Sequence, residues 1–160
     1  MFNKVCIIGC GLIGSSIARS IKKNNLSRKV VSSNRSNNTN KKIIKLNIVD
    51  EASSDTKKIV KGSDLIIIAT PLSSYENVIL KINKSLKKGS ILTDVGSVKE
   101  KVISLIEKNI PKDVSWISSH PIAGTEESGP ESGFAELFKN RWCILTPSSR
   151  AKNQDLKLLE

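Results

Sequence analysis

The sequence predicts an α/β fold with a doubly wound, mostly parallel sheet. Three observations predict it: an apolar run that leads into a glycine-spaced turn, further apolar runs separated by helical patterns, and an aliphatic composition. Hydrophobic residues make up 38% of the 160 residues and aromatic residues only 4%, as suits a core of Ile, Val and Leu. We expect one Rossmann-type domain over residues 1–147, with residues 148–160 starting a linker or a helical domain that is cut short.

The first apolar run leads into three glycines with G-x-G-x-x-G spacing, Gly9, Gly11 and Gly14. Each has its own steric reason: a tight turn, close backbone approach to a pyrophosphate, and close packing of helix on strand. The backbone N–H groups that open the helix, at Leu12 and Ile13, would face the pyrophosphate with the positive end of the helix dipole behind them. Glycines also collect in ordinary turns, but here a strand precedes them and a helix follows. The stretch therefore predicts a dinucleotide-binding loop.

The rest of the chain alternates between apolar runs and helical patterns. We expect further strands over residues 29–34, 64–70, 91–95, 114–119 and 141–147. We expect helices over residues 13–24, 41–46, 55–61, 73–86 and 97–111, and another from Pro130 that buries Phe134, Leu137 and Phe138. Residues 47–54 show no clear pattern. This order of elements is that of a sheet whose strands are joined by helices.

The end of the second strand bears on the cofactor. An acidic residue about twenty positions after the glycine loop would bind the ribose hydroxyls of NAD, whereas this chain has Asn34, Arg35 and Ser36 there. Without a carboxylate, and with a guanidinium that can bind a 2′-phosphate, the site is predicted to prefer NADP over NAD. The alternative is that Arg35 is a surface arginine. Thr70 and Pro71, where a later strand ends, are expected to line the same cleft.

Two polar residues follow later strands at the edge where such sheets bind ligands. His120, the single histidine of the chain, ends the strand of residues 114–119, and its side-chain type has an ordinary pKa of about 6.5, which suits a proton acceptor. Ser97 follows the strand of residues 91–95 and forms a capping box with Glu100, yet its hydroxyl can also donate to a ligand. The alternatives are that His120 has only a structural role and that Ser97 only caps the helix that follows it.

Composition bears on partners and location. The net charge of +11 comes from scattered lysine pairs without interleaved aromatic residues, so we expect an anionic small ligand and no nucleic acid. There is no apolar run long enough to cross a bilayer, so we expect no membrane partner. The first strand begins almost at Met1, which predicts a cytoplasmic protein. The three cysteines lack metal-ligand spacing and are expected to be free thiols, with no metal bound.

The sequence resembles the prephenate and arogenate dehydrogenases, also called cyclohexadienyl dehydrogenases. The resemblance extends from Val5 to Pro147. Three stretches carry it: Gly9-Cys10-Gly11-Leu12-Ile13-Gly14, Asp94-Val95-Gly96-Ser97-Val98-Lys99, and His120-Pro121-Ile122-Ala123-Gly124-Thr125-Glu126. The third stretch, continued through Gly133–Phe138 to Trp142–Pro147, is the most specific of them.

The resemblance implies an oxidative decarboxylation in tyrosine biosynthesis. Hydride passes from the carbinol carbon of a cyclohexadiene ring to the nicotinamide, carbon dioxide leaves, and the ring becomes aromatic. The histidine that His120 matches accepts the proton of the ring hydroxyl, and the serine that Ser97 matches binds that hydroxyl beside the nicotinamide. Thr125 and Glu126 match residues that line the substrate pocket, the glutamate controlling access.

The length departs from the family pattern. Its members continue for roughly as many residues again, as a helical domain that mediates homodimerisation and supplies cationic groups for the substrate carboxylates. We therefore expect this chain to be the cofactor-binding half, which binds dinucleotide with little turnover. Two other functions stay open: an NADP-dependent hydroxyacid-type dehydrogenase, which normally uses a lysine in a later helix, and a dinucleotide-binding module without catalysis.

Overall fold

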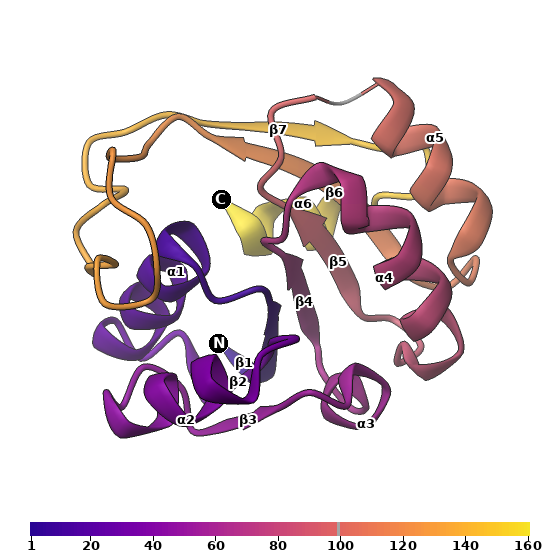
Figure 1. The fold of residues 1–160 in the computed structure, drawn as a ribbon. Coiled ribbons are helices and arrows are strands. Elements are labelled where there is room, and N and C mark those ends of the chain that lie inside the picture. Colours follow the sequence, from indigo (N-terminus) through magenta and orange to yellow (C-terminus); the bar gives the residue numbers. More distant parts are fainter. Residues whose placement is uncertain (99) are drawn as a thin grey trace.

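The computed structural model of the chain contains one seven-stranded sheet with helices on both faces (Figure 1). It describes residues 1–98 and 100–160, without the side chains of residues 100 and 101. The strand order is β3-β2-β1-β4-β5-β6-β7, with all pairs parallel except β6 with β7. This order, in which the chain starts at β1 and runs outward first to one side and then to the other, confirms the predicted Rossmann-type fold.

The strands are β1 (Phe2–Ile8), β2 (Ser27–Ser33), β3 (Glu51–Ser53), β4 (Leu65–Ile68), β5 (Ile91–Asp94), β6 (Ser115–Pro121) and β7 (Cys143–Pro147). The helices are α1 (Leu12–Lys23), α2 (Asn37–Lys45), α3 (Thr56–Val60), α4 (Tyr75–Ile82), α5 (Glu100–Asn109) and α6 (Asn153–Leu159). In the described part of the chain, no helix is long and apolar enough to cross a membrane.

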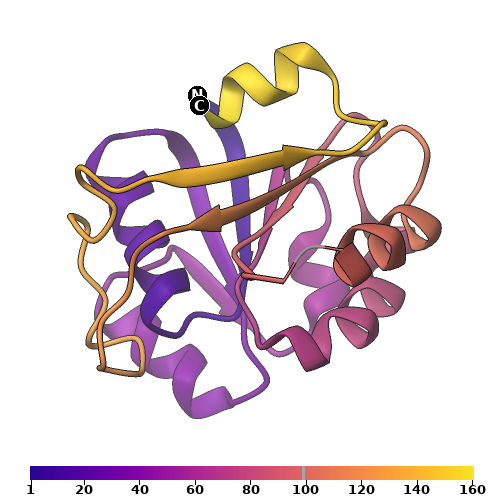
Figure 2. The same ribbon diagram turned by 90° about the horizontal axis from the view of Figure 1, so that it is seen from above.

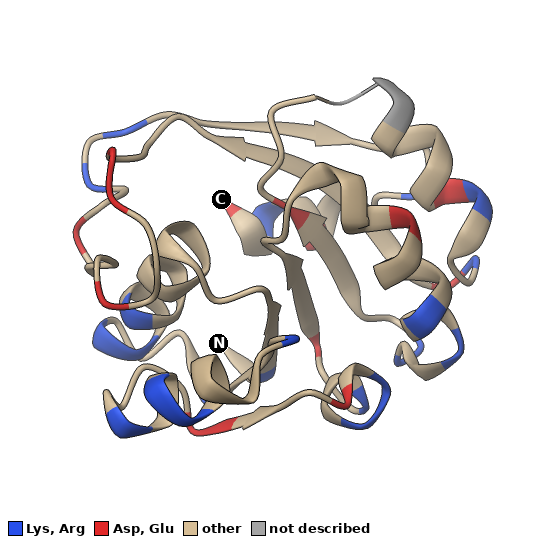
Figure 3. Ribbon diagram, in the orientation of Figure 1, with Lys and Arg blue, Asp and Glu red and all other residues tan. Residues whose placement is uncertain are grey.

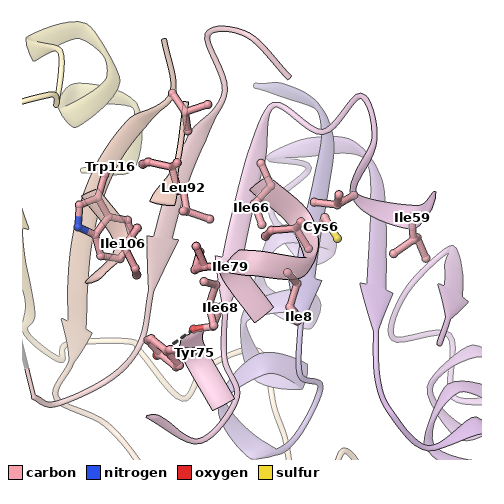
Figure 4. Packing of buried hydrophobic residues seen from close by; sticks show 14 of the residues in the cluster. Cys6, Ile8, Ile59, Ile66, Ile68, Tyr75, Ile79, Leu92, Ile106 and Trp116 are labelled. Carbon is pink, nitrogen blue, oxygen red and sulfur yellow. Dashed lines mark hydrogen bonds between the residues drawn. The ribbon is translucent and has the colours of Figure 1, made fainter. Parts of the chain in front are cut away.

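Alternate residues of β1 pack in two separate hydrophobic clusters. Val5 and Ile7 pack in the cluster that includes residues of α1, α2 and α6. Cys6 and Ile8 pack in the cluster of α3, α4 and α5, where Figure 4 shows them with Ile79. Because side chains of a strand alternate between faces, the continuous apolar runs of the sequence fill both layers. Figure 2 shows the same division farther along the sheet, with α6 on one side of β6 and β7 and α5 on the other.

Two elements on the β2 side differ from the expected positions. Helix α2 begins four residues before the expected start, because the Ser36 hydroxyl accepts a hydrogen bond from the Thr39 N–H at 3.3 Å and caps it. The unassigned stretch contains β3, which pairs with Val31–Ser33 of β2. So short a strand depends on its neighbour, and its own sequence contains no apolar run that would predict it.

The helix expected from Pro130 does not form. The segment of residues 122–142 instead contains successive tight turns, with backbone hydrogen bonds such as Lys139 N–H to Glu136 C=O and Arg141 N–H to Phe138 C=O. Left-handed backbone at Gly129 (φ 88°) and Asn140 (φ 58°) interrupts any regular helix. Leu137 is buried, as expected. The prediction for Phe134 is wrong, since it is 41% exposed, and Phe138 is only partly buried.

Helix α6 packs on the sheet. Leu156 and Leu159 contact the cluster of α1 and α2, and the buried Asp155 accepts a hydrogen bond from the Ser115 hydroxyl at the start of β6. The helical pattern expected after residue 148 is thus confirmed, and the helix lies against the sheet. The domain boundary at residue 147 stays a prediction.

Candidate functional site

The glycine loop between β1 and α1 has the close contacts that its spacing predicts. Gly9 has a φ of 94°, and a Cβ there would lie 2.7 Å from the Ala69 carbonyl oxygen. A Cβ on Gly14 would overlap the carbonyl oxygen of Gly9, so helix and loop can approach this closely only with glycine. Gly11, by contrast, faces open space, with no atom within 4 Å of its Cβ position. Two glycines therefore shape the loop and the third leaves room for a ligand.

Helix α1 opens directly from this loop. Gly11 is its N-cap, and its first turn contains no acidic residue. The first N–H groups of a helix, here from Leu12 and Ile13, lack intrahelical acceptors, and the helix dipole adds partial positive charge. The structure thus places Gly9, Gly11 and the opening turn of α1 together, as predicted, and their role in binding an anion stays a prediction.

Asn34 supports the loop from the end of β2. Its side-chain oxygen accepts a hydrogen bond from the Cys10 N–H at 2.6 Å, and its amide nitrogen donates to Ser32 Oγ and Asn40 Oδ1. Because a backbone N–H can only donate, this contact fixes which end of the amide faces the loop. The asparagine is buried and both ends of its side chain are engaged. It therefore holds the loop as well as lining the cleft, a role that the sequence pattern did not reveal.

A cleft of about 540 Å³ lies where β1, β2 and β4 end. Five of the predicted residues line it: Gly9, Asn34, Arg35, Thr70 and Pro71. Arg35 is exposed, and Lys81 of α4 adds a second cation that the sequence analysis missed. The residues that line this cleft include no carboxylate. Ser36 is not among them, because it caps α2 instead.

Lysine and arginine residues lie on the helices of this half of the sheet, and three of them, Lys22, Lys23 and Lys42, pair with carboxylates. Figure 3 shows Lys and Arg on α1, α2 and α3, the helices around the β1, β2 and β3 half of the sheet. Such a distribution attracts anionic ligands over distances of about 10 Å at moderate salt. The cations that line the cleft itself are Arg35 and Lys81.

Ser97 and His120 lie farther along the same edge of the sheet. β5 and β6 are adjacent and parallel, so Ser97, which follows the end of β5, and His120, near the end of β6, share that edge. Ser97 is exposed and His120 is partly buried, opposite Ile144 of β7. Neither lines the cleft at β2 and β4. Lys99, which belongs to one stretch of the family resemblance, and the Glu100 side chain of the expected Ser97 cap lie outside the described residues.

The predicted substrate residues lie on the segment of residues 122–142. Thr125 lines a second cavity of about 490 Å³ together with Lys139 and Arg141. Its hydroxyl oxygen accepts a hydrogen bond from the Glu127 N–H at 3.2 Å. Glu126 is exposed and does not line this cavity, so its role stays a prediction.

The same segment packs against α1, and Figure 1 shows it covering that helix. The Phe134 N–H donates to Ser16 Oγ at 3.1 Å, and a Cβ on Gly133 would overlap the Ser15 hydroxyl. Two ion pairs, Lys23 with Glu136 and Lys42 with Glu131, join the segment to α1 and α2. Residues that follow His120 are thereby held next to the start of α1.

The sheet order, the glycine loop and the cleft beside it define the class of nucleotide-binding Rossmann domains. Residues 17–160 match the family model described as prephenate dehydrogenase, nucleotide-binding domain. The chain belongs to this family, as the resemblance predicted.

Known proteins of this family are similar over nearly the whole chain. A cyclohexadienyl dehydrogenase of Zymomonas mobilis is 37% identical over 154 residues, which are 96% of this chain and 52% of that protein. The crystal structure of Aquifex aeolicus prephenate dehydrogenase in complex with hydroxyphenyl propionate and NAD+ matches with a TM-score of 0.90 and 28% identity, over 99% of this chain and 55% of that one. The crystal structure of Synechocystis arogenate dehydrogenase also matches with a TM-score of 0.90 and 28% identity, over 98% of this chain and 54% of that one. The chain spans about half the length of the curated relatives it matches.

Proposed function

We propose that this chain is the NAD(P)-binding half of a dehydrogenase that oxidatively decarboxylates prephenate or arogenate. The observation that carries the proposal is the placement of Ser97 and His120 at the ligand edge of a sheet whose family is that of the prephenate dehydrogenases. The residues present fit a dinucleotide: Gly11 faces open space, helix N–H groups open α1, and a cleft without carboxylates lies beside them. When bound, the nicotinamide supplies the hydride acceptor.

His120 and Ser97 have different roles toward the ring hydroxyl. His120 takes its proton as hydride leaves the carbinol carbon, and Ser97 donates a hydrogen bond that orients the oxygen. The ring carboxylate departs as carbon dioxide, and its bonding electron pair makes the ring aromatic. Proton return from His120 to the phenolate oxygen completes the cycle. Thr125 and Glu126 line the substrate side on the segment that follows, with Glu126 controlling access.

The test is an assay of the complete gene product and of this chain. With prephenate or arogenate, the complete product is expected to form NADPH or NADH and carbon dioxide in equal amounts, measured by absorbance and by gas release. The chain of 160 residues is expected to bind the dinucleotide with little turnover. Substantial turnover by this chain would contradict a need for the second half, and absence of turnover with both substrates in the complete product would contradict the proposed reaction.

We propose NADP as the preferred cofactor, with Arg35 binding its 2′-phosphate. Arg35→Ala is expected to raise the dissociation constant for NADP+ about ten- to a hundredfold, because a hydrogen-bonded charge pair contributes about 1.5–3 kcal/mol. The dissociation constant for NAD+, which lacks that phosphate, is expected to change less than about twofold. Isothermal titration calorimetry measures both.

The matched control is Arg28→Ala. Arg28 is another exposed arginine of the β2 region, but it lies in the strand itself and does not line the cleft. Its replacement is expected to leave both dissociation constants unchanged. Wild-type binding of NAD+ as tight as that of NADP+, or tighter, would overturn the preference.

A further inference from the structure

A fully buried carboxylate, Asp94, lies at the end of β5 and binds the residues that precede the two candidate residues. One oxygen of Asp94 accepts hydrogen bonds from Ser118 Oγ at 2.7 Å and from the Ser119 N–H at 3.1 Å. The other accepts from the Gly96 N–H at 2.9 Å and from the Tyr75 hydroxyl at 3.1 Å. A single side chain thus joins the end of β5, the following turn, β6 and α4.

The backbone groups that Asp94 binds immediately precede the candidate residues. Gly96 comes directly before Ser97, and Ser119 comes directly before His120. We propose that Asp94 is a positioning residue that sets the Ser97 hydroxyl and the His120 imidazole relative to each other. The inference rests on the proposed function for the roles of those two residues, but the placement itself can be tested without turnover.

The hydrogen-bond pattern requires a carboxylate. Backbone N–H groups can only donate, and one approaches each oxygen of Asp94. An asparagine at this position would turn its NH2 group toward either Gly96 or Ser119, where donor would meet donor. The substitution therefore breaks one of the two links whichever way the amide is turned, although its shape matches that of aspartate.

The surroundings hold the carboxylate and its partners in place. Burial, together with the charge of Asp94, raises the pKa of Tyr75 far above its ordinary value, so its hydroxyl stays a donor. Figure 4 shows Tyr75 in the core with its hydroxyl beside Ile68, whose carbonyl oxygen is 3.4 Å away. A Cβ on Gly96 would lie 3.0 Å from Asp94 Oδ2 and 3.1 Å from the Tyr75 hydroxyl oxygen, so a larger residue in the turn would crowd both groups.

Nuclear magnetic resonance of the 160-residue chain tests the inference. His120 is the only histidine, so its imidazole gives one assignable signal. In Asp94→Asn, hydrogen exchange at the Gly96 or the Ser119 amide is expected to accelerate about ten- to a hundredfold, and the Ser97 amide or the His120 imidazole signal to shift with it. In the complete gene product, kcat is expected to fall by up to about a hundredfold while the dissociation constant for NADP+ stays within about twofold.

Asp155→Asn is the matched control. Asp155 is also buried and also bonded to β6, but through Ser115 at the opposite end of that strand. Its replacement is expected to lower the free energy of unfolding without shifting the signals of Ser97 and His120. Unchanged signals in Asp94→Asn, or equal shifts in both variants, would show a purely structural role and overturn the inference.

Two milder variants keep the test decisive if Asp94→Asn does not fold. Tyr75→Phe removes one donor on the Gly96 side, and Ser118→Ala removes one on the Ser119 side. The first is expected to shift the Ser97 amide and the second the His120 imidazole. If neither signal moves, the inference fails. These signals need no substrate, so they would be unchanged if the proposed reaction proved wrong. A failure of this inference can therefore be distinguished from a failure of the proposed function.

Discussion

Replacing Gly14 with alanine is expected to abolish dinucleotide binding and to destabilise the domain. The new methyl group would overlap the Gly9 carbonyl oxygen and lie 3.2 Å from Ile7 Cγ2, so α1 must move away from β1 and take the loop with it. Overpacking of this kind costs about 1–3 kcal/mol. We expect the affinity for NADP+ to fall at least about a hundredfold, since the loop N–H groups lose their positions. Urea unfolding and calorimetric titration measure the two effects.

Comparison with Gly11→Ala distinguishes a loss of binding that is due to contact with the ligand from one that is due to a disturbed fold. Gly11 has a φ of −81° and open space at its Cβ position, so the free energy of unfolding is expected to stay within about 1 kcal/mol of wild type. Affinity for the dinucleotide is still expected to fall, because the methyl group enters the space for the pyrophosphate. Normal binding by both variants would show that the pyrophosphate lies elsewhere.

The largest effect on chemistry is expected for His120→Asn in the complete gene product. Asparagine keeps a polar, hydrogen-bonding side chain but cannot take a proton at neutral pH, so kcat is expected to fall about 10²- to 10⁴-fold. Since His120 does not line the cleft at β2 and β4, the dissociation constant for NADP+ is expected to stay within about twofold. Steady-state kinetics and calorimetry give both values.

Three other outcomes would each contradict a different part of this prediction. A variant that keeps wild-type kcat would rule out His120 as the base. A fall in kcat that is matched by an equal loss of cofactor affinity would point to misfolding of the edge instead. A dinucleotide-binding module without catalysis would have no prephenate- or arogenate-dependent turnover in either form.

The parts of the fold that sequence could predict are those determined locally. β1, β4 and β5 lie in apolar runs, and two glycines of the loop, Gly9 and Gly14, have close contacts that a larger residue could not make. The start of α2 differs from the expected one, although serine, here Ser36, is a preferred N-cap residue. β3 has no signal of its own, because it exists through pairing with β2. Pro130 suggested a helix start, but the turns that replace it depend on packing against α1.

The site, too, could be predicted only where it is determined by local sequence. Arg35, Thr70 and Pro71 could be placed on the cleft because each follows the end of a strand. The role of Asn34 in holding the glycine loop could not be predicted, because its hydrogen bond joins it to Cys10, which lies 24 residues earlier in the chain. Asp94 likewise binds Ser118 across 24 residues. Polar contacts between distant segments leave no periodic pattern in the sequence, so only the folded chain reveals them.

The attachment of residues 122–142 to α1 has a thermodynamic consequence. Ser16 donates its hydroxyl to the Leu12 carbonyl and accepts from the Phe134 N–H, so the first turn of the helix and the segment beyond His120 share one side chain. We expect a dinucleotide that shifts this turn also to shift the segment on which Thr125 lies. If it thereby changes the affinity for a ligand bound on that segment, linkage requires that ligand to change the affinity for the dinucleotide by the same factor. The hydrogen bonds of Ser16 are where we expect such heterotropic coupling to pass.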